Sequence, residues 1–272
     1  MKLKKISLAL IVLGSLSIST VFAADATTTD ATTTDTTTTT NNQQFSPAAQ
    51  QAIGKIAADY IVAHPEVLIA ATQALQQKEM AAQQAAAEKG ISKNTNDLFF
   101  SKASPTTGNP DGTIALVEFF DAQCGHCKAM VDVIDNLIKA NPNLKVIYKE
   151  FPIFGGQSST AAKAAIAVYL MDPSKYKAFH TALLRAQSPL TEEMIMGFAK
   201  KAGINTDKLK TEMNSKAVSD ELAKTVNIAE QLRIMGTPYF VIAKSTGTNF
   251  TTIPGAAAQQ AIQEKIDTLK TS

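Results

Sequence analysis

Hydrophobic residues recur at helical spacing between residues 46 and 90. Ser46-Pro47 is typical of a helix start, because serine caps free N–H groups and proline fits the first turn. His64-Pro65-Glu66 breaks this helix, and a second helix is expected to end at Gly90. The apolar positions are Ile53, Ile56, Ala57, Tyr60 and Ile61 in the first helix, and Leu68, Ala71, Leu75 and Ala82 in the second.

These two helices carry narrow apolar faces in a segment rich in alanine and glutamine, so they cannot build a core of their own. They can dock on the rest of the same chain or pair with another copy of it. We favour the pairing of copies, which makes residues 46–90 an N-terminal helical oligomerisation segment.

Strand patterns begin after residue 90. Thr113–Asp121 (TIALVEFFD) and Leu144–Glu150 (LKVIYKE) are rich in apolar, aromatic and branched residues, as buried strands are. The helical face between them consists of Met130, Val131, Ile134, Leu137 and Ile138. Strand, helix and strand predict a parallel unit with a right-handed crossover, which forms the first part of an α/β domain over residues 91–156.

Only helical patterns are found across residues 157–235. Strand patterns return at Pro238–Ala243 and Thr248–Ile253, and a helix over residues 256–270 closes the chain. Residues 236–272 are therefore the second part of the domain. The predicted fold class is α/β, interrupted by an all-α helical insert and preceded by a helical extension.

The first 23 residues have the pattern of a secretory signal peptide. Lys2, Lys4 and Lys5 precede an apolar run from Ile6 to Ile18, and small residues lead to Ala23. The run is shorter than the roughly 20 residues that a membrane span needs. We expect cleavage near Ala23 and export to the periplasm, where the chain stays free or associates with the outer membrane.

Residues 24–45 are dominated by threonine. Eleven threonines lie between Asp25 and Gln44, where no apolar side chain is larger than alanine. Such a composition cannot offset the entropy lost on ordering, so we predict a disordered Thr-rich tether. An interaction segment or a glycosylated stalk is the alternative.

Charge argues against one class of partner. The formal net charge of the chain is +2, and removal of the three lysines in the signal peptide changes it to about −1. The sequence also has no cluster of basic residues. We therefore expect no nucleic-acid partner.

Both cysteines of the chain lie in EFFDAQCGHCKAMVDVI, from Glu118 to Ile134. A disulfide between Cys124 and Cys127 closes too short a loop to add much stability. A structural zinc site needs four ligands, and attachment of a c-type haem needs histidine where the chain has Lys128. The pair is therefore predicted to be a redox-active dithiol in an exported chain that has no structural disulfide.

Three features favour the thiolate form of Cys124. It lies where a strand meets a helix, and the free N–H groups and dipole of a helix start stabilise negative charge. Gly125 lets the backbone turn tightly, and His126 can donate a hydrogen bond or carry a positive charge. Cys127, one turn into the helix, is expected to resolve the mixed disulfide. A stabilised thiolate makes the disulfide form a stronger oxidant.

Four further residues are candidates for the site. Glu118 interrupts an apolar strand, and Lys149 in the next strand could pair with it. A buried Glu118 with a raised pKa could exchange a proton with Cys127; alternatively, both charged side chains face solvent. Thr237 and Pro238 suit a cis peptide bond, which would expose the preceding carbonyl and N–H to a substrate strand.

Other residues that could carry chemistry are given structural roles. His64 and His180 are expected to be surface or packing histidines and not ligands. Four methionines are expected in the core and not in a copper site: Met194, Met196, Met213 and Met235.

The segment VEFFDAQCGHC, the helix after it, the helical insert and GTPYF together resemble the DsbA family of exported thiol-disulfide interchange proteins. The resemblance covers Leu98–Lys270 and implies a thioredoxin-like domain with an inserted helical domain. It also implies that Cys124 is the attacking thiol and Cys127 the resolving thiol. By the same likeness, Glu118 is the buried acid below the thiols and Pro238 is a cis-proline.

The chain departs from this family in three places. Gly125-His126 lies between the cysteines, as in eukaryotic protein disulfide isomerases, where the best-known DsbA has Pro-His. Potentials of about −180 mV for the isomerase and about −120 mV for DsbA imply a somewhat weaker oxidant here. Thr237 before the proline is similar to the isomerase DsbC. Residues 46–90, with HPEVL at the hinge, resemble the extensions of oligomeric relatives such as ScsC.

The resemblance implies a periplasmic thiol-disulfide oxidoreductase that introduces or isomerises disulfides in exported proteins. It uses the Cys124–Cys127 disulfide and no cofactor or metal. The expected partners are exported substrate proteins, a DsbB-like or DsbD-like membrane redox partner, and further copies in a homo-oligomer, with a dimer favoured. The alternatives are a copper(I)-binding protein that uses Cys124, His126 and Cys127, and a surface antigen or scaffold carried by the tether.

Overall fold

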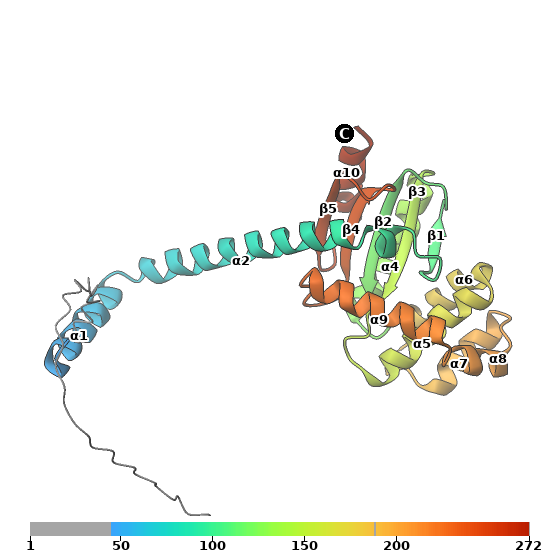
Figure 1. Cartoon of the computed structure of the whole chain (residues 1–272), viewed down its shortest axis with the longest axis horizontal. Coiled ribbons are helices and arrows are strands. Elements are labelled where there is room, and N and C mark those ends of the chain that lie inside the picture. Colours follow the sequence, from blue (N-terminus) through green and yellow to red (C-terminus); the bar gives the residue numbers. More distant parts are fainter. Residues whose placement is uncertain (1–44, 188, 272) are drawn as a thin grey trace, which may run out of the picture. The chain divides into compact units, whose positions relative to one another are not determined.

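The computed structural model describes residues 45–187 and 189–271. The predicted signal peptide and the predicted tether up to Gln44 lie outside these residues. The chain divides into two units between Val62 and Ala63. Helix α1 belongs to the first unit, and the sheet and the other helices belong to the second (Figure 1).

α1 (Pro47–Ala63) begins where the Ser46-Pro47 pair predicts. The Ser46 hydroxyl accepts a hydrogen bond from the Ala49 N–H at 3.3 Å, which is the contact of a helix cap. None of the residues of α1 is buried, and the side chains of Ile56 and Tyr60 are largely exposed. In the single chain, α1 therefore leaves its apolar side chains open to solvent.

A five-stranded mixed sheet of order β1-β3-β2-β4-β5 forms the centre of the second unit (Figure 1). β2 and β3 are parallel, with Ile114 opposite Leu144, and the other neighbours are antiparallel. β1 was not predicted, because two threonines and a glycine show no pattern. The strands are β1 (Thr106–Gly108), β2 (Ile114–Phe120), β3 (Leu144–Glu150), β4 (Tyr239–Lys244) and β5 (Phe250–Pro254).

Helices cover both faces of this sheet. α4 crosses from β2 to β3 with the predicted apolar face, and α5 to α9 form the helical insert between β3 and β4. The fold class is as predicted. The helices of the second unit are α2 (Glu66–Lys93), α3 (Thr95–Phe99), α4 (Gly125–Ala140), α5 (Gly156–Met171), α6 (Pro173–Arg185), α7 (Glu192–Lys201), α8 (Thr206–Glu212), α9 (Lys216–Gln231) and α10 (Gln259–Thr271).

Polar side chains define the starts of the insert helices. The side chain before each of α6, α7, α8 and α9 accepts a hydrogen bond from a backbone N–H of the first turn. These caps are Asp172, Thr191, Asn205 and Ser215. Each such cap contributes about 1 kcal/mol to the helix that it starts.

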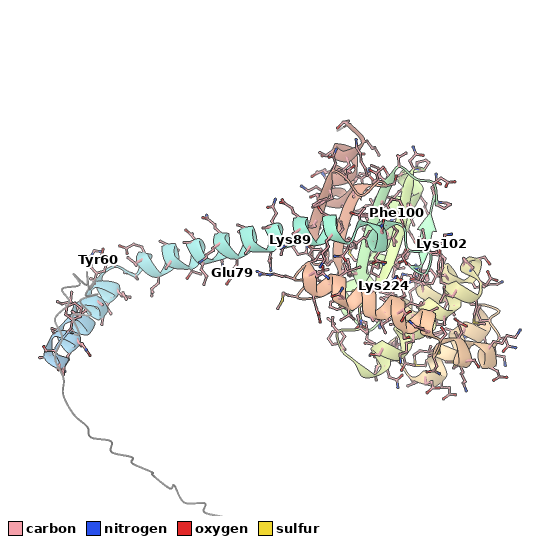
Figure 2. The ribbon with its side chains drawn as sticks, in the orientation of Figure 1. Tyr60, Glu79, Lys89, Phe100, Lys102 and Lys224 are labelled. Atoms are coloured by element: carbon pink, nitrogen blue, oxygen red, sulfur yellow. The ribbon has the colours of Figure 1, made fainter. Side chains whose placement is uncertain are left out.

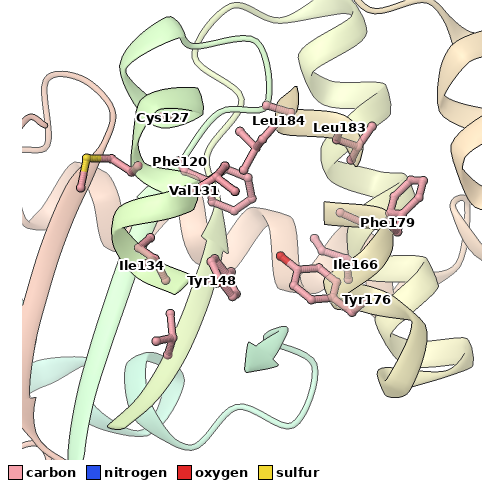
Figure 3. Close-up of a cluster of buried hydrophobic side chains, with 14 of the residues drawn as sticks. Phe120, Cys127, Val131, Ile134, Tyr148, Ile166, Tyr176, Phe179, Leu183 and Leu184 are labelled. Carbon is pink, nitrogen blue, oxygen red and sulfur yellow. The ribbon is translucent and has the colours of Figure 1, made fainter. Parts of the chain in front are cut away.

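The core has two parts because successive strand residues point to opposite faces of the sheet. On one face, Leu116, Phe120 and Tyr148 pack with α4, α10 and the insert. Figure 3 shows side chains of β2, β3, α4 and α6 meeting there. On the other face, Val117 and Phe119 pack with α3, α9 and the end of α2. Each large apolar side chain that becomes fully buried stabilises the fold by about 1.5–3 kcal/mol.

α2 is exposed along most of its length. Every residue from Glu66 to Ala85 is exposed, whereas Ala87 and Ile91 are buried in the core cluster that includes α9. Figure 2 draws the side chains along this helix and labels Glu79 and Lys89. Only the last third of α2 therefore packs on the rest of the second unit.

The predicted end of the second helix at Gly90 is wrong. α2 continues to Lys93, and Gly90 lies inside it. A Cβ atom on Gly90 would lie 2.5 Å from Cδ1 of Leu232, so the glycine is needed for the close approach of α2 to the residue after α9. Gly90 is therefore explained by close packing against Leu232 and not by the end of the helix.

The methionine prediction is correct in part. Met213 is buried and Met194 and Met196 are partly buried, but Met235 is 87% exposed in the loop between α9 and β4. Within residues 45–187 and 189–271, no helix combines the length and the apolar character needed to cross a membrane.

Candidate active site

The two cysteines lie at the start of α4, four and seven residues after the end of β2. Cys124 is the N-cap residue, with extended backbone angles (φ −71°, ψ 120°), and Cys127 is the third residue of the helix. The backbone N–H of Cys124 donates to the Asp121 carbonyl at 3.0 Å. Both thiols are free and buried. The sequence therefore places a dithiol on the positive end of a helix dipole, as predicted.

A second segment, far away in sequence, completes the site. The Thr237–Pro238 peptide bond is cis. The Cys124 thiol donates a hydrogen bond to the Thr237 carbonyl at 3.3 Å. The loop before β4 and the first turn of α4 therefore meet at the Cys124 sulfur, and the expected cis bond is found.

The two residues between the cysteines are exposed. Gly125 is the first residue of α4 and its φ is not positive, so the backbone there has an ordinary helical conformation. A Cβ atom on Gly125 would meet nothing within 4 Å. Gly125 therefore leaves the space above the cysteines open, and the His126 side chain is directed to solvent at the same surface.

Glu118 lies in β2 and is 1% exposed. Burial raises the pKa of its carboxyl to about 8; nearby Lys177 opposes the rise and Cys124 adds to it. Its Oε2 atom is buried and has no hydrogen-bond partner among the described residues. Burial, and then the nearby Glu118, raises the pKa of the Cys127 thiol far above its ordinary value. Both groups therefore hold their protons at neutral pH.

The predicted pairing of Lys149 with Glu118 is wrong. Glu118 lies opposite Tyr148 in the parallel pairing, and Lys149 lies opposite Phe119, so Lys149 points to the other face of the sheet. There its ammonium group is fully buried and pairs with Glu221 at 3.0 Å. The alternative that both side chains face solvent is also wrong. Lys149 takes no part in the dithiol site.

Four residues near Glu118 were not predicted as part of the site. Tyr148 and Glu150 lie on the same face of the sheet as Glu118, and α6 adds Tyr176 and His180. The Tyr176 hydroxyl lies 3.1 Å from Nδ1 of His180, and the Tyr148 and His180 rings are 4.3 Å apart. Alternation within β3 could have placed Tyr148 and Glu150 on one face, but nothing in the sequence joins them to α6.

The buried residues next to Glu118 add no charge of their own at neutral pH. Burial raises the pKa of Glu150 well above its ordinary value, and Asp121 and Glu118 add to the rise. Burial lowers the pKa of His180 to about 3, so its ring is neutral. His180 is thus a packing histidine, as predicted. A neutral, buried surround favours the protonated form of Glu118.

A metal site has little support in this part of the chain. Across residues 45–187 and 189–271, no group of three or more His, Cys, Asp or Glu side chains could hold a metal ion. Among the described residues of the site, the soft donors are the two thiols, and His126 is exposed between them in sequence.

Comparison with known proteins assigns the domain. The profile of the DSBA-like thioredoxin domain matches residues 115–267. The chain belongs to this DsbA-like family. It is a thiol-disulfide oxidoreductase, and Cys124 and Cys127 lie inside the matched domain as free, buried thiols. A second profile, the N-terminal domain of the copper resistance protein ScsC, matches residues 50–82.

Individual relatives agree with the DsbA-like assignment. Disulfide bond formation protein D of Bacillus subtilis is 24% identical over 159 residues, which cover 55% of this chain and 72% of that protein. BcfH of Salmonella enterica Typhimurium is 33% identical with a TM-score of 0.68, over 82% of this chain and 96% of that one. The thiol-disulfide exchange protein α-DsbA2 of Wolbachia pipientis is 29% identical with a TM-score of 0.62, over 70% and 98% of the two chains.

Proposed function

We propose that this DsbA-like oxidoreductase works in the periplasm, where it introduces and isomerises disulfide bonds in exported proteins through Cys124 and Cys127. One observation carries the proposal. The Cys124 sulfur lies 3.3 Å from the Thr237 oxygen, next to the exposed Gly125. Both cysteines are buried, but Cys124 is 6% exposed and Cys127 only 1%. Cys124 is therefore the thiol that a substrate sulfur reaches first.

Oxidation of a substrate then takes two exchange steps. A substrate thiolate attacks Cys124 Sγ of the oxidised pair, the bond from Cys124 to Cys127 breaks, and Cys127 leaves with the electron pair. A second substrate thiolate attacks the substrate sulfur of this mixed disulfide, and Cys124 leaves as a thiolate. The substrate loses two electrons and the pair gains them. Isomerisation starts from the reduced pair, with Cys124 attacking a wrong substrate disulfide.

We assign Glu118 the proton transfer in the first step. The Cys127 thiolate released by the attack is in a buried site that strongly favours the thiol. Glu118 is protonated at neutral pH, because its pKa is raised to about 8, and it lies within electrostatic reach of both thiols. Transfer of the Glu118 proton to Cys127 neutralises the leaving thiolate, and reversal of the step supplies the base for the next cycle.

The place and partners of the enzyme follow from the same proposal. The signal-peptide pattern of residues 1–23 supports export, and exported proteins with unpaired thiols are the substrates that this chemistry can use. Each oxidation leaves Cys124 and Cys127 reduced, so a pure oxidase needs a membrane partner of the DsbB type. An isomerase needs the pair kept reduced by a partner of the DsbD type.

Oligomerisation through the N-terminal helices is the part of the proposal that favours isomerisation. α1 buries none of its residues in the single chain, and residues 50–82 match the ScsC N-terminal domain. Apolar helix faces of this kind are covered when copies associate. Two or more catalytic units would then hold one misfolded substrate between them.

The test compares the mature chain with a chain that starts at Ala63, which removes α1 and leaves the second unit intact. Both are assayed for oxidation of a reduced protein and for refolding of a protein with scrambled disulfides. We expect both to oxidise, only the mature chain to reshuffle, and Cys124→Ser to do neither. Equal reshuffling by the two chains would show that α1 is not needed for isomerisation, and oxidation by Cys124→Ser would refute the site.

Copper(I) binding is the second candidate function, because the ScsC profile that matches residues 50–82 is named for copper resistance. Soft thiolates of Cys124 and Cys127 are suitable ligands for copper(I). Titration of the reduced protein with copper(I) under anaerobic conditions tests this function directly. Tight binding that is lost in Cys127→Ala, together with no exchange activity, would replace the oxidoreductase proposal by the copper one.

A further inference from the structure

A groove beside the active site has walls from two distant parts of the chain. It encloses about 470 Å³ between α2, the loop before β4 and the edge strand β5. This volume is in the range of pockets that bind a ligand or a few side chains. On the α2 side the wall includes Met80 and Gln84, and on the other side it includes Met235, Tyr239 and Phe250.

The groove and the Cys124 sulfur share one neighbour, Thr237. Thr237 is one of its lining residues, and the same Thr237 accepts the hydrogen bond of the Cys124 thiol. A substrate cysteine joined to Cys124 in a mixed disulfide therefore has its neighbouring residues at the mouth of the groove. Through Thr237, the groove lies next to the proposed site of exchange.

The lining suits apolar side chains of varied shape. Met80 and Met235 come from opposite walls and are 60% and 87% exposed. Methionine side chains are flexible and polarizable, so they adapt to different apolar partners. The lining holds one acidic and one basic side chain, Glu88 and Arg233, and no excess of either sign. This composition favours an uncharged, extended polypeptide over a strongly charged partner.

The position of the groove on α2 separates two tasks of that helix. Met80, Gln84 and Ala87 recur at helical spacing on the face that lines the groove. Ala82 of the predicted oligomerisation stripe is two residues from Met80, which is a rotation of about 200° around the helix. The stripe that could meet another copy therefore lies on the opposite face, and association of copies leaves the groove wall open.

We propose that α2 forms one wall of the substrate groove, and that Met80 and Gln84 contact the unfolded polypeptide on one side of its reacting cysteine. The occupant is an extended segment of an unfolded protein with large apolar residues next to a cysteine. This inference rests on the proposed function and adds to it a role in substrate selection for a helix outside the thioredoxin-like domain.

A matched pair of substitutions tests the proposal in the full chain. Gln84→Trp fills the groove. Gln73→Trp makes the same change on the same helix face three turns earlier, where the side chain is exposed and does not line the groove. For a reduced, unfolded protein as substrate, we expect kcat/KM of Gln84→Trp to fall by about fivefold or more. With reduced glutathione the change should stay below about twofold. Gln73→Trp should match the wild type with both substrates.

Four outcomes overturn the inference, and they differ in what else they affect. If both tryptophan variants keep the wild-type rate with the unfolded protein, or if Gln84→Trp loses equally with both substrates, the groove does not select polypeptides. If the wild-type chain reacts with glutathione but not with the unfolded protein, the groove inference fails and the thiol chemistry stands. If it reacts with neither, the proposed function fails as well.

A photo-crosslink identifies the occupant directly. A benzoylphenylalanine at position 84 is combined with Cys127→Ala, which traps the mixed disulfide between Cys124 and the unfolded protein. We expect crosslinks from position 84 to substrate residues next to the trapped cysteine. Crosslinks from position 84 to another copy of the chain, or to its own Thr-rich segment, would assign the groove to that occupant and refute the proposal.

Discussion

Two buried carboxylates on opposite faces of the central sheet differ in their hydrogen-bond partners and in the direction of their pKa shifts. Glu118 has an oxygen without a hydrogen-bond partner among the described residues, and burial raises its pKa to about 8. Glu221 receives hydrogen bonds from Lys149, Ser101 and Ser104. Burial acts to raise the pKa of Glu221 too, but Lys149 and the serine hydroxyls hold it below its ordinary value.

The comparison teaches that the hydrogen-bond and ion-pair partners of a buried acid, and not its burial alone, decide whether it is protonated or charged. Glu118 is kept protonated beside two thiols, where a proton can move. Glu221 is kept charged, and its contacts join three separate segments: Ser101 and Ser104 after α3, Lys149 in β3, and Glu221 itself in α9. On one face of the sheet lies the acid that we propose as the proton carrier, and on the other lies an ion pair that holds three segments together.

The largest expected effect is on stability, and it comes from the buried ion pair of Lys149 and Glu221. Glu221→Ala leaves the Lys149 ammonium buried without its counter-charge, so we expect a loss of about 3–5 kcal/mol in the free energy of unfolding at pH 7. Denaturant unfolding measures it. The contribution of Glu221 is present above the ordinary carboxyl pKa of 4.5 and is lost as the pH falls through the lowered native pKa.

The matched control for this prediction removes both charges. Lys149→Met combined with Glu221→Leu should recover most of the lost stability, because no uncompensated charge remains. Exchange activity should be unchanged in the folded variants, since the pair lies on the face away from the dithiol. A loss below about 1 kcal/mol for Glu221→Ala would show that Lys149 finds another partner or deprotonates.

Glu118→Gln should have the opposite effect on stability, and it should depend on pH. Since the native pKa of about 8 lies above the ordinary value of 4.5, the unfolded chain releases this proton first. The wild type therefore loses up to about 1.4 kcal/mol per pH unit between these values, and the variant does not. At pH 7 the variant should be more stable by at most about 3 kcal/mol. Equal slopes of stability against pH for both proteins would contradict the raised pKa.

The same substitution should slow the chemistry. With no acid below the thiols, Glu118→Gln should reduce the rate of exchange by about tenfold at pH 7, because the Cys127 thiolate must wait for a proton from solvent. Stopped-flow measurement of the reaction with a reduced peptide gives this rate. Glu221→Gln is the control on the other face and should keep the wild-type rate; slowing by both variants would point to a general change in the sheet.

The smallest expected effect concerns the sheet contact next to Glu118. Tyr148→Phe removes the hydrogen bond between the Thr107 and Tyr148 hydroxyls, which are 3.2 Å apart, and should cost about 1 kcal/mol. Thr107→Val removes the same bond from the other side. A double-mutant cycle should show that the two losses do not add. Full additivity would show that the hydroxyls do not interact.

The sequence predicted the parts of the site that depend on local order along the chain. Cys124 at the start of α4 and Pro238 at the start of β4 follow from a strand, a helix and a proline in the right sequence. The sequence also shows that side chains alternate between the two faces along β3. This alternation did not show which side chains share a face with Glu118, because the pairing of Glu118 with Tyr148 is a property of the folded sheet. Lys149 was therefore assigned to the wrong face.

Contacts between distant segments were beyond sequence reasoning. The partner of Lys149 lies 72 residues away in α9, and the cluster of Tyr176 and His180 reaches the sheet only because the insert folds back on it. The Gly90 signal was visible but ambiguous, since a glycine can end a helix or allow another backbone to come close. The register of α2 against Leu232 decided between the two.

Both cysteines of the chain are in the reactive pair, and the structure holds its shape with both as free thiols. The fold therefore depends on no oxidation event. A newly made copy can therefore reach its folded state before its own Cys124–Cys127 pair has been oxidised. The buried ion pair of Lys149 and Glu221 links distant segments of the chain, as a disulfide does in many exported proteins. Unlike a disulfide, this pair cannot be broken by a reductant.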